Sequence, residues 1–114
     1  MILVDTSVWV HHLRHGSADL RSLLENGEVL CHPFIVGELA CGSIANRKEV
    51  LELLKALPIA SIAEHDEVML FLHEKRLYGR GLGWIDLHLL ASASLSNASL
   101  WTTDRPLKTA AEGQ

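Results

Sequence analysis

The sequence has no long apolar run and little cysteine, and each shortage excludes a class of protein. Its apolar runs fall far short of the roughly 18 residues that a bilayer-spanning helix needs, so we expect no transmembrane segment. Cys31 and Cys41 are the 2 cysteines among 114 residues and form no C-x-x-C pair, which favours reduced thiols and a cytoplasmic protein. The start has no basic region and carries Asp5, so we expect no secretory signal.

Basic residues are also scarce. The 10 Lys and Arg are outnumbered by 14 Asp and Glu, which gives a net charge of −4 and argues against a broad basic surface for nucleic acid. A nuclease is not excluded, because metal ions carry positive charge that this count omits. Hydrophobic residues make up 48% and charged residues 21%, which excludes disorder and predicts one domain over residues 1–114.

Short apolar strand patterns alternate with helix patterns along the whole chain. We expect strands at Ile2–Val4, Val29–Cys31, Ile59–Ser61 and Ser99–Thr103. We expect helices from Thr6 or Ser7 through Leu13, from Ser17 to Gly27, from Pro33 to Gly42, from Asn46 to Pro58, at Glu64–Tyr78, at Trp84–Ser96 and from Pro106 to Gln114. The alternation predicts an α/β fold of three layers, α/β/α, around a short parallel sheet of about four strands.

The helix starts carry recognisable capping residues. Ser7 or Thr6 is expected to cap the first helix, and Ser17 the second. Two capping boxes are expected, one between Asn46 and Glu49 and one between Ser61 and Glu64.

Two acidic residues follow strand patterns at the place where ligands gather in parallel sheets. Asp5 and Asp104 come after the first and last strands, and carboxyl ends of neighbouring parallel strands share one edge. Glu38 and Asp86 are further candidates, each among apolar neighbours on a helix. Each acid also has a purely structural alternative: Asp5 and Asp104 as helix caps, Asp86 as a partner of the helix dipole, and Glu38 at a solvated helix edge.

Convergence of these acids would require a cation. If four carboxylates came within about 5 Å, each pair would repel by roughly 3 kcal/mol at an effective dielectric constant near 20. A divalent ion removes that conflict, and ligands that are all oxygen select magnesium or manganese over zinc.

Four stretches together resemble the PIN-domain ribonucleases, and most closely the VapC-type toxins of bacterial toxin–antitoxin pairs. These stretches are ILVDTSVW (2–9), HPFIVGELACG (32–42), GRGLGWIDLHLLA (79–91) and LWTTD (100–104). The resemblance covers nearly the whole chain, with the stretches in the same order and at similar spacing.

The resemblance implies a Mg²⁺-dependent endoribonuclease, with Mn²⁺ as a second usable ion, and an antitoxin protein as partner. It implies a catalytic quartet of Asp5, Glu38, Asp86 and Asp104. We expect Asp5 and Asp86 to contact the metal, with Glu38 and Asp104 acting directly or through water. The hydroxyl residues Ser7 and Thr102 are implied to orient ligands or the attacking water.

The chain departs from the family at two points. Arg105 and Pro106 follow Asp104 where many members carry another acid, which leaves one or two metal ions open. Many members also continue into a fifth strand, so a full fifth strand is not expected here.

Several other signals are weaker. Arg80 lies among three glycines and is expected either to contact an RNA phosphate or to belong to a flexible loop. His11, His12 and His15 have no motif that supports zinc. Trp9, Trp84 and Trp101 are interpreted as core or interface anchors rather than base-stacking platforms.

The mean hydropathy of +0.18 predicts association, as a homodimer and with the antitoxin. The helices around Val50–Leu57 and Val68–Tyr78 are the candidate faces. Two alternative functions remain: a degenerate PIN-fold module that only binds a partner, and an aspartyl-phosphate phosphatase acting through Asp5. The second is disfavoured because Ser7 stands where that chemistry needs an aspartate.

Overall fold

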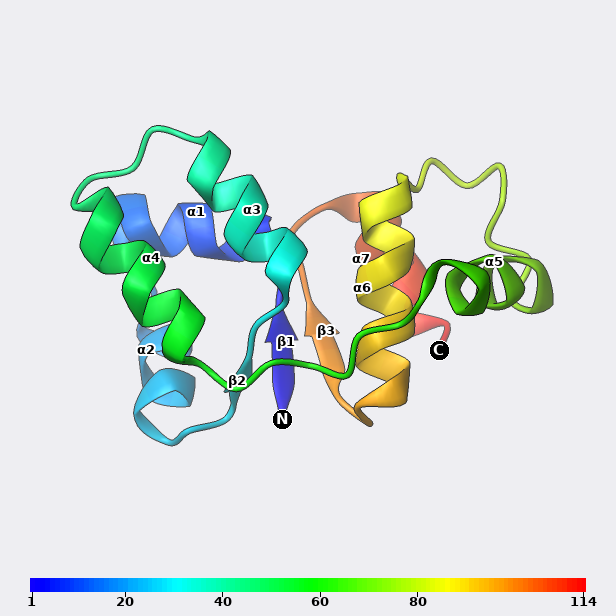
Figure 1. Ribbon diagram of the computed structural model, residues 1–114, viewed down its shortest axis with the longest axis horizontal. Coiled ribbons are helices and arrows are strands. Elements are labelled where there is room, and N and C mark those ends of the chain that lie inside the picture. Colours follow the sequence, from blue (N-terminus) through cyan, green and yellow to red (C-terminus); the bar gives the residue numbers. More distant parts are fainter.

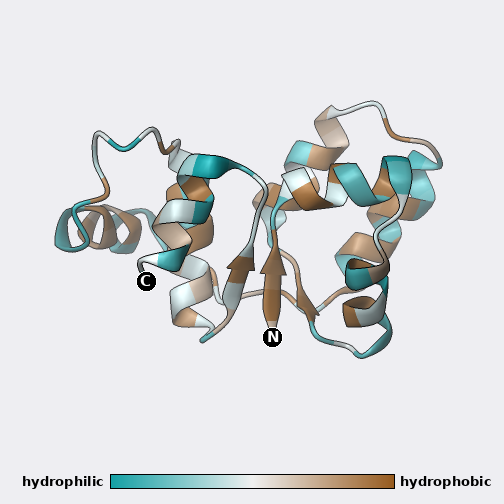
Figure 2. Ribbon diagram, turned by 180° about the vertical axis from the view of Figure 1, so that it is seen from behind, coloured by the Kyte–Doolittle hydropathy of each residue, from teal (hydrophilic) through white to brown (hydrophobic).

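Three short parallel strands form the centre of the computed structural model, which describes residues 1–114 (Figure 1). Strand β1 (Ile2–Val4) lies between β2 (Val29–Leu30) and β3 (Ser99–Trp101), so the strand order is β2-β1-β3. Leu3 of β1 pairs with Leu30 on one side and with Leu100 on the other. The central strand is apolar along its whole length, as Figure 2 shows, because helices cover both of its faces.

Seven helices surround this sheet and give the expected α/β/α arrangement. They are α1 (Thr6–His15), α2 (Ala18–Glu25), α3 (Pro33–Cys41), α4 (Arg47–Ala56), α5 (His65–Glu74), α6 (Trp84–Leu95) and α7 (Arg105–Glu112). Helices α1 to α4 gather on the β2 side, and α5 to α7 on the β3 side (Figure 1). Even the longest, α6, has 12 residues, and no helix could cross a membrane.

The buried apolar side chains form two clusters, one on each side of the sheet. The larger joins β1 and β2 to α1–α4 and to Leu89 of α6, and it includes Leu20 and Ile35, which have no exposed surface. The smaller joins α5, α6 and α7 through Val68, Leu90 and Leu107. Helix α6 contributes to both clusters, so it ties the two sides of the sheet together.

The sheet has three strands rather than four. At the expected strand Ile59–Ser61, only Ile59 forms a bridge, to Cys31. The Cys31 N–H donates to the Pro58 carbonyl at 2.8 Å, and the Ala60 N–H donates to the Cys31 carbonyl at 2.9 Å. Proline has no N–H for a ladder, and Ile59 is 55% exposed, so nothing buries a longer strand here.

Several helix starts differ from the expected ones. Asp5, and neither Thr6 nor Ser7, is the N-cap of α1, because both hydroxyls bond to carboxylates instead. The expected Ser17 cap is confirmed, since its Oγ accepts the Leu20 N–H at 3.2 Å. His32 caps α3 through Nδ1, which accepts the Phe34 N–H at 3.0 Å, and no sequence pattern indicated this cap.

Neither expected capping box forms. Asn46 is the N-cap of α4, but its backbone is left-handed at φ 53° and its side chain makes no cap bond. At α5 the box links Glu64 to Glu67 rather than Ser61 to Glu64, and the Glu64 N–H donates to Glu67 Oε1 at 2.9 Å. In a capping box, the glutamate at the third helical position accepts the backbone N–H of the N-cap residue. Glu67 has that position here, because the helix begins three residues later than the expected box required.

Helix α5 also ends four residues earlier than expected, at Glu74. Arg76 adopts a left-handed backbone at φ 51°, which the helix cannot continue through. The Leu77 N–H then donates to the Leu72 carbonyl, and the Leu77 side chain is buried in the smaller cluster. The segment from Tyr78 to Gly83 is a loop that leads into α6.

Candidate functional site

Parallel pairing brings the residue after β1 next to the residues after β3. The Asp5 N–H donates to the Trp101 carbonyl at 2.9 Å, which extends the ladder one residue beyond β1. Thr102 follows directly, and Asp104 lies two residues further on. The expected meeting of Asp5 and Asp104 at one sheet edge is therefore a consequence of strand register.

The Asp5 carboxylate is buried and held by two hydroxyl groups. It has 7% of its surface exposed, and its Oδ2 accepts from Ser7 Oγ at 2.8 Å and from Thr102 Oγ1 at 2.7 Å. Its other oxygen, Oδ1, accepts no hydrogen bond from the chain. Hydrogen bonds to a charged group are each worth about 1.5–3 kcal/mol, so this side chain is held in one orientation with one oxygen free.

The two hydroxyls are themselves fixed by backbone groups. Ser7 Oγ accepts the Thr103 N–H at 3.1 Å, and Thr102 Oγ1 accepts the Asp104 N–H at 3.0 Å. Because each oxygen already accepts a backbone proton, its own proton is left to point at Asp5. The network thus connects Asp5 through Thr102 to the backbone of Asp104.

Asp86 and Asp104 each use one oxygen at a helix start. Asp104 is the N-cap of α7, and its Oδ2 accepts the Leu107 N–H at 3.1 Å. Asp86 lies in the first turn of α6, and its Oδ2 accepts the Gly83 N–H at 2.9 Å. The structural alternatives weighed for these two acids are therefore real, but each capping bond occupies one oxygen and leaves the other without a partner.

Glu38 is exposed on α3, which agrees with the structural alternative of a solvated helix edge. Its Oε1 accepts a hydrogen bond from Thr6 Oγ1 at 2.7 Å. This bond joins α3 to the first residue of α1, directly beside Asp5. All four acids thus share one pattern, in which the chain binds one carboxylate oxygen and the second has no protein donor.

The charges of three of these acids act on one another. Burial raises the pKa of Asp86, the Gly83 N–H opposes that rise, and the negative charges of Asp104 and Asp5 add to it. No cationic side chain is among the groups that act on Asp86.

The carboxylates do not converge as tightly as the sequence suggested. No group of three or more His, Cys, Asp or Glu side chains is close enough to enclose a metal ion. The capping bonds of Asp86 and Asp104 hold these side chains against their own helices, and like charges without a cation repel. The donor set still suits a hard cation, because four free carboxylate oxygens border one sheet edge and Mg²⁺ usually keeps several waters.

Arg80 lies exposed in the loop between α5 and α6. A Cβ at the neighbouring Gly81 would lie 3.8 Å from Pro106, so this loop rests on the first turn of α7. Gly81 has φ 77°, a backbone conformation that favours glycine. Arg80 therefore lies near the residues that follow Asp104. The first of these, Arg105, is exposed at the start of α7.

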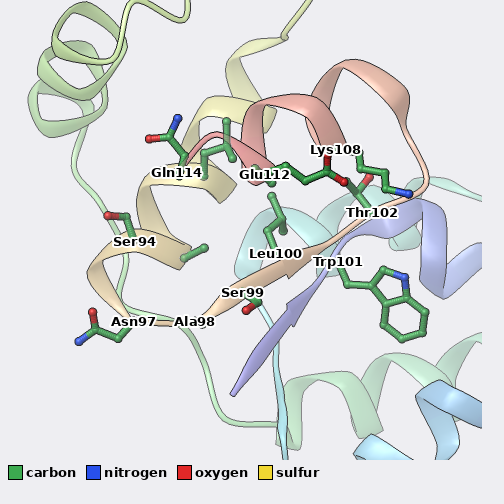
Figure 3. Close-up of a pocket in the computed structure, with 13 residues that line it drawn as sticks. Ser94, Asn97, Ala98, Ser99, Leu100, Trp101, Thr102, Lys108, Glu112 and Gln114 are labelled. Atoms are coloured by element: carbon green, nitrogen blue, oxygen red, sulfur yellow. The ribbon is translucent and has the colours of Figure 1, made fainter.

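A separate cavity lies along the outer edge of β3 (Figure 3). It is an open groove of about 620 Å³ between β3, α6 and α7, and its lining includes Leu100, Lys108 and Glu112. It reaches Thr102 but none of the four acids. The carboxylate site is thus a surface at the strand ends rather than an enclosed pocket.

Sequence reasoning missed two contributors to the site. Thr6 holds Glu38 across 32 positions, and the Gly83 N–H holds Asp86. The first pairing joins residues distant in sequence, so no local pattern could have shown it. The second could have been found from the three-residue spacing of a capping box.

Comparison with known proteins gives a consistent result. The PIN domain family matches residues 2–113. Ribonuclease VapC32 of Mycobacterium tuberculosis, from strains CDC 1551 / Oshkosh and ATCC 25618 / H37Rv, is 50% identical over 111 residues. The match covers 96% of this chain and 90% of that relative.

We predict that Asp86→Asn raises the melting temperature of the metal-free protein at pH 7 by a few degrees. The amide still accepts the Gly83 N–H, while the charge that burial and two carboxylates disfavour is gone. A raised folded-state pKa means that the ionised form destabilises the fold, so the gain is present at neutral pH. It vanishes at about pH 3, where both states of the parent are protonated.

Thermal denaturation in EDTA at the two pH values measures this. Asp19→Asn, in the first turn of α2, is the matched control and should give no gain, because that exposed acid complements its helix dipole. A lower melting temperature for Asp86→Asn at pH 7 would show that Asp86 is not under charge repulsion.

Proposed function

Because the chain belongs to the PIN-domain family, as a ribonuclease of the VapC type, we propose that it cleaves RNA at the carboxylate site with the help of Mg²⁺. In this proposal residues 1–114 act as one PIN domain and as the toxin of a toxin–antitoxin pair. Its place of action is the cytoplasm, where the RNA substrate is found. The observation that carries the proposal is the position of Asp5, Asp86 and Asp104 near one sheet edge, where burial and the negative charges of Asp104 and Asp5 raise the pKa of Asp86.

Asp5 and Asp86 would hold the metal ion. Asp5 is the most buried of the four acids, and its two hydroxyl bonds leave Oδ1 free at the sheet edge. Asp86 likewise keeps one oxygen free beside the Gly83 contact. Glu38 and Asp104 would complete the site directly or through water, as befits more exposed side chains. When bound, Mg²⁺ orients and acidifies a water and stabilises negative charge on the phosphate.

The neighbouring residues of the chain position these ligands and the substrate. Ser7 and Thr102 fix the orientation of Asp5, and such supporting bonds typically change metal affinity or activity about 10- to 100-fold. Arg80, on the loop that rests against α7, would contact an RNA phosphate.

The phosphatase alternative loses support at Ser7. An aspartyl-phosphate mechanism needs a second acid beside the nucleophile, whereas the Ser7 hydroxyl donates to Asp5 Oδ2 and accepts a backbone proton. That hydroxyl is committed to holding Asp5 and cannot serve as an acid or a base of suitable pKa.

We predict that Asp5→Asn and Asp86→Asn each abolish cleavage of a labelled single-stranded RNA, because each removes a full negative charge from the metal ligands. Glu38→Gln and Asp104→Asn should be severe but leave residual activity if these residues act through water. EDTA should stop the parent protein, and Mg²⁺ or Mn²⁺ in excess should restore it. Gel analysis of the RNA products measures all of these.

Asp19→Asn is the matched control for removing an acid, and His11→Ala and His12→Ala test for a metal-free mechanism that uses histidine. All three should retain cleavage. Full metal-dependent activity of Asp86→Asn, or cleavage that continues in EDTA, would place the chemistry elsewhere.

We further propose that the chain forms a homodimer through the α5–α6 face and binds an antitoxin protein. Helix α5 lies at one end of the longest axis of the molecule (Figure 1). Leu70 of α5 is 58% exposed and Leu95 of α6 is 50% exposed, and both line a groove of about 190 Å³ between these helices. Apolar side chains gathered at a groove mark a protein contact more strongly than single exposed ones do.

We predict a dimer at micromolar concentration that Leu70→Arg converts to a monomer, because the guanidinium cannot be buried unpaired in an apolar contact. Ile59→Arg, at a residue 55% exposed outside both candidate helices, is the control and should leave the dimer intact. Light scattering after size-exclusion chromatography measures both. A monomeric parent, unchanged when the product of the neighbouring gene is added, would contradict both partner proposals.

A further inference from the structure

Five aromatic side chains form a continuous row beside the carboxylate site. The row starts at His32 before α3 and passes through Phe34, His88 and Trp84 to His65 on α5. Ring centroids are 5.1 Å apart for His32 and Phe34 and 4.9 Å for Phe34 and His88. They are 4.9 Å apart for His88 and Trp84 and 5.1 Å for Trp84 and His65. All four separations lie in the range where aromatic pairs attract.

The buried His88 ring contacts both Phe34 and Trp84. It is 7% exposed, and its ring stands at 70° to Phe34 of α3 and at 85° to Trp84 of α6. Its Nδ1 is buried without a hydrogen-bond partner, so contacts with rings position the imidazole.

Phe34 and Trp84 are the exposed members of this central trio. Each has 38% of its surface exposed, whereas Trp9 in the main core has 4%. Because both half-exposed rings pack against the buried His88, they form a surface that exists before any ligand binds. Such a surface binds without first ordering flexible side chains.

The row adjoins the proposed metal ligands on both helices. Phe34 lies one turn before Glu38 and on the same side of α3, since residues four apart are helical neighbours. Trp84 shares the first turn of α6 with Asp86. Helices α3 and α6 lie next to each other on the near side in Figure 1. Along its own helix, each ring is thus within about one turn of a proposed metal ligand.

The charge of the chain limits how it can hold RNA. Its net charge is −4, and the site itself carries four acids, so attraction to phosphates supplies little affinity. Bases are uncharged and have π faces that stack on aromatic side chains. Non-electrostatic contacts are thus the remaining source of substrate affinity near the site.

We propose that Phe34 and Trp84 form a stacking platform for an unpaired base of single-stranded RNA, with His88 as the residue that positions both rings. The exposure of Trp84 thus revises its interpretation from the sequence as a core or interface anchor. The proposal rests on the ribonuclease function above and names its substrate class. Duplex RNA keeps its bases paired and stacked within the helix, so the platform selects single strands. The alternative occupant, a protein partner, is one outcome of the test.

Fluorescence anisotropy of a labelled single-stranded RNA, measured with Asp5→Asn protein to prevent cleavage, tests this. Phe34→Ala and Trp84→Ala should each weaken binding about 10-fold, as expected for one lost base stack. Trp84→Phe should bind within about two-fold of the parent, because a ring remains. His88→Ala should weaken binding and His88→Phe should restore it, which separates ring positioning from imidazole chemistry.

Two controls isolate stacking. Tyr78→Ala removes an exposed aromatic ring outside the row, 60% exposed, and should have no effect. An RNA of the same length without bases should bind equally weakly to the parent and to every platform variant. Circular dichroism checks folding, and if Trp84→Ala does not fold, Trp84→Leu keeps apolar volume without an aromatic face and should show the same loss.

Normal affinity of Phe34→Ala and Trp84→Ala for base-bearing RNA would overturn the platform, and would leave a protein contact as the use of these rings. An equal loss towards RNA without bases would also overturn it. Cleavage by the parent protein is measured separately. If the parent cleaves RNA but binding does not depend on Phe34 and Trp84, only the platform is refuted. If binding depends on these rings but the parent does not cleave RNA, only the proposed catalysis is refuted.

Discussion

Repulsion among the carboxylates where β1 and β3 end is the constraint on which the rest of the site depends. Parallel pairing places Asp5 beside the segment from Thr102 to Asp104, and α6 brings Asp86 into the same field. No cationic side chain acts on Asp86 to offset these charges. Burial and these charges together disfavour the ionised form of Asp86, and in the proposed function a bound cation would relieve that cost.

Hydrogen bonds hold this arrangement without neutralising it. A hydrogen bond to a carboxylate contributes about 1.5–3 kcal/mol, which is enough to hold a charged side chain in one orientation. Ser7, Thr102 and the helix starts can therefore fix the acids while the charge remains. Because each bond takes one oxygen, the same contacts that give order also leave a free ligand atom on every acid.

Sequence patterns predicted the architecture well where the signals were local. The β1 and β3 runs, the Pro33 start of α3 and the acids after the strands follow from short apolar runs and capping chemistry. Failures arose where one residue had two possible uses. The Thr6 and Ser7 hydroxyls suit a helix cap equally well, and only the neighbouring carboxylates, one of them 32 positions away, decide their use.

Other features lay beyond sequence reasoning because they depend on packing between helices. The contact of Phe34 with His88 joins α3 to α6 and has no counterpart in local spacing. The carboxylates lie further apart than the sequence suggested, because the capping bonds of Asp86 and Asp104 hold these side chains against their own helices. The expected fourth strand is only a single bridge at Ile59, since Pro58 has no N–H to donate and no helix buries the Ile59 side chain.

Calorimetric titration of Mg²⁺ into the metal-free protein tests the central claim most directly. The account predicts saturable binding that Asp5→Asn removes and that Ser7→Ala combined with Thr102→Val weakens about 10- to 100-fold, because the free oxygen of Asp5 is then no longer oriented. Absence of any saturable Mg²⁺ binding to the parent, or equal affinity in the Ser7 and Thr102 double variant, would contradict it.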